Sequence, residues 1–297
     1  MLCGNYILSN RSEWTFYFLS SVQFNFTIGD LKILKQKLNN SNAQYLDEEV
    51  NWLLENIGNS KSEIRDDLVC NSLGAGFFEE KFTNKQVLFL INQLEERNLL
   101  FYRIQENGEA TLTRSFTCLL WDLIIRTNND KKSQYYQILD KNKEKQIFKN
   151  LIRYLANEHD FTGFSKEYGW VHAVAHCSDA LADSILCDDF DQRMVADFLL
   201  ATKEMLNKVD GRFIDGEEYR LADVFVNGFK ENKINSDSFV NWIKSFTFNP
   251  YSDELLEYYR FNNLKLLLQD IYVKLNSISL LNPNVKEIVE KKFNSEY

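Results

Sequence analysis

The scarcity of residues that interrupt helices constrains the fold of this chain more than any other feature. Only two prolines and eleven glycines occur among its 297 residues. Proline and glycine end or bend helices and form the turns between short strands, so their scarcity permits long helices and disfavours a turn-rich β-sandwich. Because 44% of the residues are hydrophobic, the chain can form a large packed core, and general disorder is excluded.

The spacing of apolar residues is helical from Asp30 onward, as at Leu31, Leu34 and Leu38. Thr83 and Gln86 have the form of a capping box before another helix. Later helices are expected at 113–127, 142–158, 168–187, 191–207, 217–231, 236–246, 252–276 and 284–293. No repeat of fixed period stands out. The sequence therefore predicts an all-α fold of about a dozen helices, arranged as an irregular α/α superhelix or solenoid-like array.

No flexible linker or change of composition divides the chain after residue 30, so residues 30–297 are expected to form a single all-helical domain. Residues 1–29 are expected to be an N-terminal extension, and whether it is ordered is left open. The uncharged, aromatic-rich run 14–29 within it is too short and too polar to span a bilayer. A membrane partner is therefore not expected.

The charge and the cysteines limit the partners and the compartment. A net charge of −9 disfavours nucleic acid, which is bound through clustered lysine and arginine. The basic stretch from Lys131 to Lys149 is interpreted as a solvated helix face. Five cysteines without a CxxC pair indicate free thiols in a reducing, cytoplasmic environment.

Imidazole and carboxylate groups are concentrated in one stretch. All three histidines lie within residues 159–176, and two of them fall on the helix expected at 168–187. At about 100° per residue, His172, His176, Asp179 and Asp183 share a stripe about 60° wide on that helix. These side chains are the candidates for lining a crevice between helices.

Three interpretations of this stripe stay open. In the first, a divalent metal (Zn, Mn, Fe or Ni) has as its predicted ligands His172, His176, Asp179 and Asp183. Glu158, His159 and Asp160, across the preceding loop, are further candidates for the same ion. Alternatively, a carboxylate and a histidine form a metal-free acid–base pair. In the third, the stripe is a satisfied buried network that fixes helix packing.

Two arginines are further candidates for the same crevice. Arg114 begins an apolar helix, and Arg220 could cross to an aspartate of the histidine helix. Glu217 and Glu218 are interpreted as partners of a helix dipole.

On these residues the chain resembles domain-of-unknown-function family 2785, a mostly bacterial, all-helical family. The similarity extends over roughly residues 30 to 245, and it departs from the family pattern at Thr162 and at Cys177-Ser178. It implies an α-helical fold with the His, Asp, Glu and Arg residues acting as one constellation, and it implies no activity. The matching motifs are Ile64-Arg65-Asp66, Arg114-Ser115-Phe116, Glu158-x-Asp160-x-x-Gly163, Gly169-Trp170-x-His172-x-x-Ala175-His176-x-x-Asp179 and Gly216-Glu217-Glu218-x-Arg220-Leu221.

The function itself is not identified by the sequence. The favoured expectation is a binding module that presents its crevice to a protein or a small molecule. The alternative is a hydrolase or lyase, metal-dependent or acid–base, that uses His172, His176 and Asp179.

Overall fold

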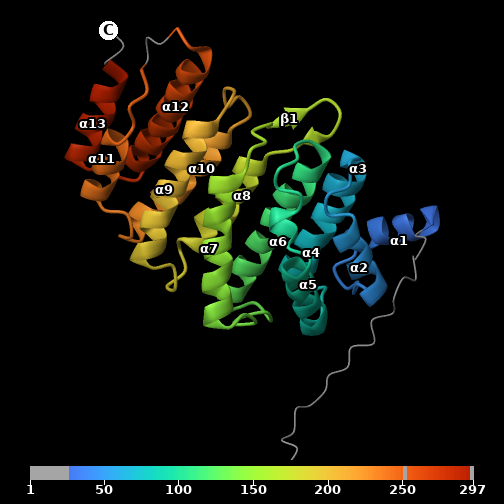
Figure 1. Ribbon diagram of the computed structural model, residues 1–297. Helices are drawn as coiled ribbons and strands as arrows, with labels where there is room; N and C mark the ends of the chain where they lie inside the picture. The colour runs from blue at the N-terminus through green and yellow to red at the C-terminus, as the bar shows by residue number, and fades with distance from the viewer. Residues whose placement is uncertain (1–26, 250–252, 295–297) are drawn as a thin grey trace, which may run out of the picture.

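The computed structural model describes residues 27–249 and 253–294, and nearly all of them belong to helices or their connections (Figure 1). In the N-terminal part the elements are α1 (Ile28–Leu38), α2 (Asp47–Glu55), α3 (Ser62–Ile64), η1 (Arg65–Cys70), α4 (Asn71–Phe78), α5 (Asn84–Glu96), η2 (Leu99–Phe101) and α6 (Glu109–Asn129). The remainder comprises α7 (Lys141–Asn157), β1 (Phe164–Ser165), β2 (Gly169–Trp170), α8 (Ala173–Ser184), α9 (Gln192–Lys208), α10 (Glu217–Lys230), α11 (Ser236–Lys244), α12 (Leu255–Ser277) and α13 (Pro283–Asn294). The all-α prediction is confirmed.

Most helices begin within a few residues of the expected positions, because side chains mark their ends. Thr83 and Gln86 form the capping box predicted for α5. Thr27 and Asp30 form a second capping box at α1, so helical structure begins inside the segment expected to be an extension. Residues 1–26, which hold the rest of that segment, lie outside the described residues.

The helices follow one another along the length of the molecule, from α1 at one end to α13 at the other (Figure 1). Helices α6, α8, α10 and α12 pack successively against each other, while α7 packs on α9 and α11 on α13. Their buried apolar side chains form one cluster from Leu34 to Val289. This arrangement places α8 at the centre, packed on several sides. That the row winds as a superhelix remains a prediction.

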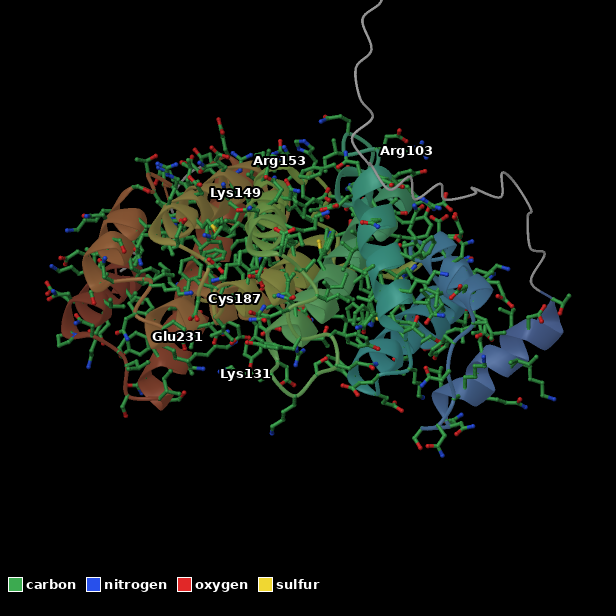
Figure 2. The ribbon with its side chains drawn as sticks, turned by 90° about the horizontal axis from the view of Figure 1, so that it is seen from below. Arg103, Lys131, Lys149, Arg153, Cys187 and Glu231 are labelled. Carbon is green, nitrogen blue, oxygen red and sulfur yellow. The ribbon has the colours of Figure 1, made fainter. Side chains whose placement is uncertain are left out.

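The basic stretch runs across the molecule: Figure 2 shows Lys149 and the nearby Arg153 toward one side and Lys131 toward the opposite side. Lys131 and Lys149 are exposed. Lys145, on α7, reaches Asp189 at 3.0 Å. The part of the stretch from Lys141 to Lys149 is thus a solvated face of α7 with local ion pairs, whereas Lys131 lies in the loop before that helix. Among the described residues, no helix is both long enough and apolar enough to cross a bilayer.

Candidate functional site

The prediction of a helix over residues 168–187 is wrong at its first turn, because α8 begins only at Ala173. This changes the position of His172. Residues 169–170 pair with residues 164–165 as a short antiparallel hairpin, β1–β2. His172 is the residue before α8 and has a left-handed backbone, with φ 47° and ψ 38°. A histidine in that conformation is strained. His172 and His176 therefore do not share a helical face, and only His176 lies on α8.

Arg65 fixes the hairpin from the side of η1. Its Nη2 donates to the carbonyl oxygens of Tyr168 at 2.6 Å and Trp170 at 3.1 Å, and its Nη1 donates to Asn59 O at 2.9 Å. The guanidinium is fully buried, so these bonds replace the water that the carbonyl groups would otherwise bind. The sequence offered one signal for this residue, the Ile64-Arg65-Asp66 motif, but no reason to place it here.

The hairpin carries exposed aromatic side chains. Trp170 is 45% exposed and Phe164 is 51% exposed, and their ring centroids are 4.9 Å apart. The indole of Trp170 also stacks on the ring of His172 at 4.5 Å. Ile214, which is 80% exposed, precedes Asp215, whose carboxylate accepts the Phe164 N–H at 2.9 Å. We call Phe164, Trp170 and Ile214 the hairpin patch.

Beneath the hairpin patch, His172 faces Glu217. The distance from His172 Nε2 to Glu217 Oε1 is 3.8 Å, too long for a hydrogen bond. Both atoms are buried and find no hydrogen-bond partner in the described part of the chain. Burial lowers the pKa of His172, and the charge of Arg220 acts in the same direction. Burial also raises the pKa of Glu217. Burial thus disfavours the charged form of both side chains.

Gly163 permits this close approach between the hairpin and the start of α10. A Cβ atom built on Gly163 would lie 2.2 Å from Glu217 Oε1 and 2.3 Å from Asp215 Oδ2. Glycine is therefore required where the loop meets these two acids. Glu217 lies in the first turn of α10, as its interpretation as a dipole partner requires, and it is also buried against the loop.

His176 is held inside the core. Its Nδ1 lies 2.8 Å from Ser115 Oγ, and the Ser115 hydroxyl donates to Val171 O. Since that hydroxyl has one hydrogen, His176 Nδ1 must carry the hydrogen of the second bond. Burial, followed by the neighbouring His172 and Arg220, lowers the pKa of His176 well below its usual range. The ring is neutral and anchors α8 to α6.

The two aspartates of the predicted stripe are paired with arginines. Arg220 binds both carboxylate oxygens of Asp179, and Arg126 Nε lies 3.3 Å from Asp183 Oδ2. Arginine pairing leaves these carboxylates poorly placed to join the histidines around one ion. Across residues 27–249 and 253–294, no three His, Cys, Asp or Glu side chains are placed to hold a metal ion together.

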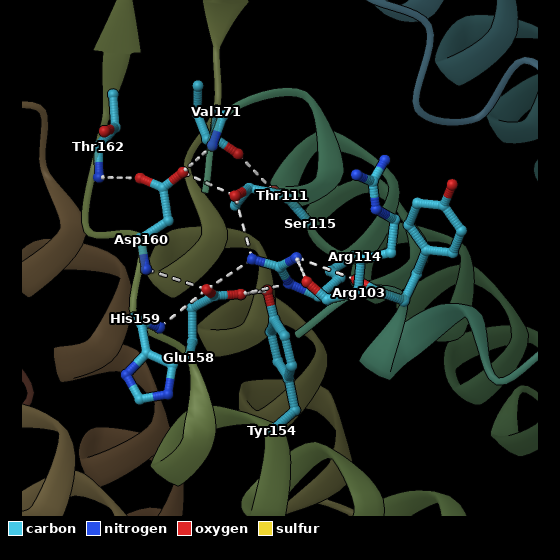
Figure 3. Close-up of polar contacts among 12 residues, drawn as sticks. Arg103, Thr111, Arg114, Ser115, Tyr154, Glu158, His159, Asp160, Thr162 and Val171 are labelled. Carbon is cyan, nitrogen blue, oxygen red and sulfur yellow. Dashed lines mark hydrogen bonds and ion pairs between the residues drawn. The ribbon is translucent and has the colours of Figure 1, made fainter. Parts of the chain in front are cut away.

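Arg114 belongs to a separate buried network, drawn in Figure 3. Its Nε and Nη2 donate to the two oxygens of Glu158 at 2.9 and 2.8 Å. Glu158 also accepts the hydroxyl of Tyr154 and the backbone N–H of His159 and Asp160. Both charged side chains are almost completely buried, so the network joins the start of α6 to the end of α7.

The residues next to Glu158 have different roles. Asp160 accepts hydrogen bonds from Gly108 N at 2.8 Å and from Thr111 Oγ1 at 2.6 Å, which fixes the loop before the hairpin. His159 is exposed and takes no part through its ring. The predicted constellation is therefore divided among separate contacts. These are the Arg114–Glu158 network, the Asp179–Arg220 and Asp183–Arg126 pairs, the His176–Ser115 contact, and His172–Glu217 under Trp170.

Comparison with known proteins gives one match. Neither a curated protein nor a solved structure matches the chain. The family described as "Protein of unknown function (DUF2785)" matches residues 100–273. This range is shifted from the expected span of 30 to 245: it begins after Arg65 and includes the hairpin and helices α8 and α10. Because the match covers more than half of the chain, this protein belongs to the family described as Protein of unknown function (DUF2785).

Proposed function

We propose that this chain is a protein-interaction module whose contact surface is the hairpin patch. The observation that carries the proposal is the exposed indole of Trp170, held from behind by the His172 ring at 4.5 Å and by Arg65 through the Trp170 carbonyl. An aromatic side chain fixed in this way loses little conformational freedom on binding. Tryptophan is also the residue type that most often dominates the energy of an interface.

The shape and surroundings of the hairpin patch support a protein partner over a small molecule. Two of its three residues lie on a hairpin that projects at the ends of the central helices (Figure 1), whereas small-molecule sites are usually concave. Neighbouring exposed apolar side chains of this kind are typical of protein contact surfaces. The net charge of −9 favours a partner with basic residues around its apolar contact.

The free thiols of Cys70, Cys118, Cys177 and Cys187 support a cytoplasmic location.

A photo-crosslinking amino acid placed at position 164 in cells tests the proposal. We expect one partner to be crosslinked from position 164, and the crosslink to be lost when Trp170→Ala is added. The same label at Leu200, which is 55% exposed on α9, is the matched control and should not capture that partner. With the purified partner, Trp170→Ala should weaken binding about 30-fold, as expected for a residue that contributes about 2 kcal/mol.

Identical crosslinks from positions 164 and 200, or binding unchanged by Trp170→Ala, would contradict the proposal. Circular dichroism of Trp170→Ala shows whether α8 remains folded, so that loss of binding is assigned to the indole.

Acid–base catalysis is the second candidate, favoured by the His172–Glu217 pair. The pKa of His172 is lowered and the pKa of Glu217 is raised. In such a pair the imidazole can accept a proton from a substrate while the carboxyl group donates one. Asp179, expected in this role, is bound by Arg220. A panel of ester, amide and glycoside substrates tests this candidate. Turnover lost in both His172→Gln and Glu217→Gln, with crosslinking at position 164 retained, would favour it.

A divalent metal at the same site would have His172 Nε2 and Glu217 Oε1 as its nearest protein ligands. Elemental analysis of untagged protein tests this alternative directly. A stoichiometric metal that is lost in His172→Gln would favour the metal-dependent form of the enzyme over the interaction module.

A further inference from the structure

A second site lies between α4 and α6, in a different part of the molecule from the hairpin patch. It is a cavity of about 480 Å³. Three exposed residues, Asn71, Phe78 and Glu79, mark its mouth. Its walls are mostly small or apolar side chains, and its lining consists of Leu38, Cys70, Asn71, Gly74, Ala75, Phe78, Glu79, Leu119, Asp122 and Leu123.

Of the two acids in this lining, Glu79 pairs with Lys81, whereas Asp122 lacks a hydrogen-bond donor in the part of the chain that the structure describes. Asp122 is 7% exposed, and its buried Oδ1 finds no hydrogen-bond donor among the described residues. Arg126 Nη1 lies 3.8 Å from the other oxygen, beyond hydrogen-bond distance. Asp183 is a second carboxyl group beside Asp122, and the two can share a hydrogen bond only when one of them is protonated. A buried carboxylate without a donor is costly.

The charges around Asp122 do not balance. Asp122 and Asp183 are two carboxylates with one guanidinium, Arg126, near both. Asp179 and Arg220, the next charged groups on α8 and α10, neutralise each other. Arg126 is itself half exposed and lies over the ring of Phe78. When both aspartates are ionised, one negative charge is therefore left beside the mostly apolar cavity.

We propose that the cavity binds a small organic ammonium ion, with its apolar body against Leu119, Leu123 and Phe78 and its ammonium group on Asp122. An ammonium group supplies both the missing positive charge and the missing donor. A metal ion fits less well because most of the lining is apolar and the described residues offer no group of three metal-binding side chains here. Burial, with the charge of Asp183, raises the pKa of Asp122 to about 8, so a proton occupies the place of the cation when the cavity is empty.

Gly74 provides a way to fill the cavity without disturbing the core. It lies within α4, and a Cβ atom built on it meets no atom within 4 Å. Leucine has a higher helix propensity than glycine by roughly 1 kcal/mol. Gly74→Leu should therefore fold at least as well as the wild type while occupying the space that the ligand needs. Gly211, which also has nothing within 4 Å, provides the matched control Gly211→Leu.

Titration calorimetry of the full chain with 2-phenylethylammonium, and separately with the neutral 2-phenylethanol, tests the proposal. We expect the ammonium to bind saturably and the alcohol to bind at least about tenfold more weakly. Asp122→Asn, which keeps the shape and removes the charge, should weaken ammonium binding by about tenfold or more. Gly74→Leu should abolish it, and Gly211→Leu should leave it unchanged.

Three results would overturn the proposal: no saturable binding of the ammonium to the wild type, equal affinity for the alcohol, or ammonium binding that survives Gly74→Leu. If Asp122→Asn does not fold, the Gly74→Leu and alcohol comparisons still decide the outcome. The crosslinking at position 164 is independent of all these results.

Discussion

His176 lies in the core with its ring between Phe116 and His172, whose ring centroids are 5.0 and 5.6 Å away. Because burial keeps its pKa well below the usual range, the folded chain holds this imidazole neutral. The unfolded chain takes up a proton there as the pH falls below about 6.5. The unfolded state then binds more protons than the folded state, so this residue decreases the free energy of unfolding as the pH falls.

Replacing His176 by asparagine should remove that contribution, because the amide nitrogen takes the place of Nδ1 beside Ser115 and does not titrate. The variant will be less stable at neutral pH. Its deficit in free energy of unfolding should shrink as the pH is lowered from about 7.5 to about 5, by at most about 1.4 kcal/mol per pH unit. Urea denaturation across this range measures the difference, and a deficit independent of pH would mean that the folded ring has an ordinary pKa.

Glu158→Gln should be strongly destabilising for a different reason. The substitution keeps the shape of the side chain but leaves the buried guanidinium of Arg114 without a counter-charge. Removing one partner of a buried pair lowers the free energy of unfolding by roughly 3–5 kcal/mol. Glu55→Gln is the control, since Glu55 pairs with Arg97 at the surface, where the loss should stay below about 1 kcal/mol. Similar losses in urea denaturation would argue against the network.

The sequence identified candidate site residues more accurately than it identified which of them lie next to one another. It placed Arg220 within reach of an aspartate on the histidine helix, and the structure pairs it with Asp179. It missed the proximity of His172 to Glu217, because helical angles were applied to a residue that precedes the helix. It also missed Asp122, which looks like any polar residue on a mainly apolar helix until the cavity beside it is seen.

At the scale of elements, the least predictable segment is the hairpin before α8. Its sequence continues the helical pattern, but Gly169 has φ 72° and the carbonyl groups of Tyr168 and Trp170 bond to Arg65, more than 100 residues earlier. A contact so distant along the chain overrides local helix propensity. The other helices were predictable because their apolar periodicity and capping residues are local.

The fit of the hairpin loop onto α10 should depend on the absence of a side chain at position 163. Gly163→Ala places a methyl group within about 2.3 Å of Glu217 and Asp215, so the loop must shift. We expect a loss of about 1–3 kcal/mol in the free energy of unfolding, typical of overpacking, and a changed environment for Trp170. Denaturation and the ¹⁹F spectrum of fluorotryptophan-labelled protein measure both effects.

Gly211→Ala is the control for that substitution, because a Cβ atom there meets nothing within 4 Å. If the two variants behave alike, close approach at Gly163 is not what holds the loop against α10.

At the scale of the whole molecule, the helices form a row in which each packs mainly on its neighbours. In solenoid arrays, the arrangement that the sequence predicts, stability is approximately the sum of local contributions, so the ends can open without the centre. Helix α8, packed between α6 and α10, is expected to open last. The hairpin patch depends on the contacts of the hairpin with η1 and with the start of α10, and the cavity depends on α4 and α6.

A core substitution near one end of the row should therefore act locally. Leu34 of α1 and Leu264 of α12 are both fully buried, and each change to alanine removes roughly 2–5 kcal/mol of packing. We expect Leu34→Ala to speed amide hydrogen exchange in α1 and α4 while α8 and α12 keep their wild-type protection, and Leu264→Ala to do the converse, speeding exchange in α12 and sparing α4. Hydrogen exchange followed by mass spectrometry resolves these segments. If either substitution lowered protection equally from α1 to α13, the molecule would unfold as one cooperative unit, and the independence expected of the two sites would be lost with it.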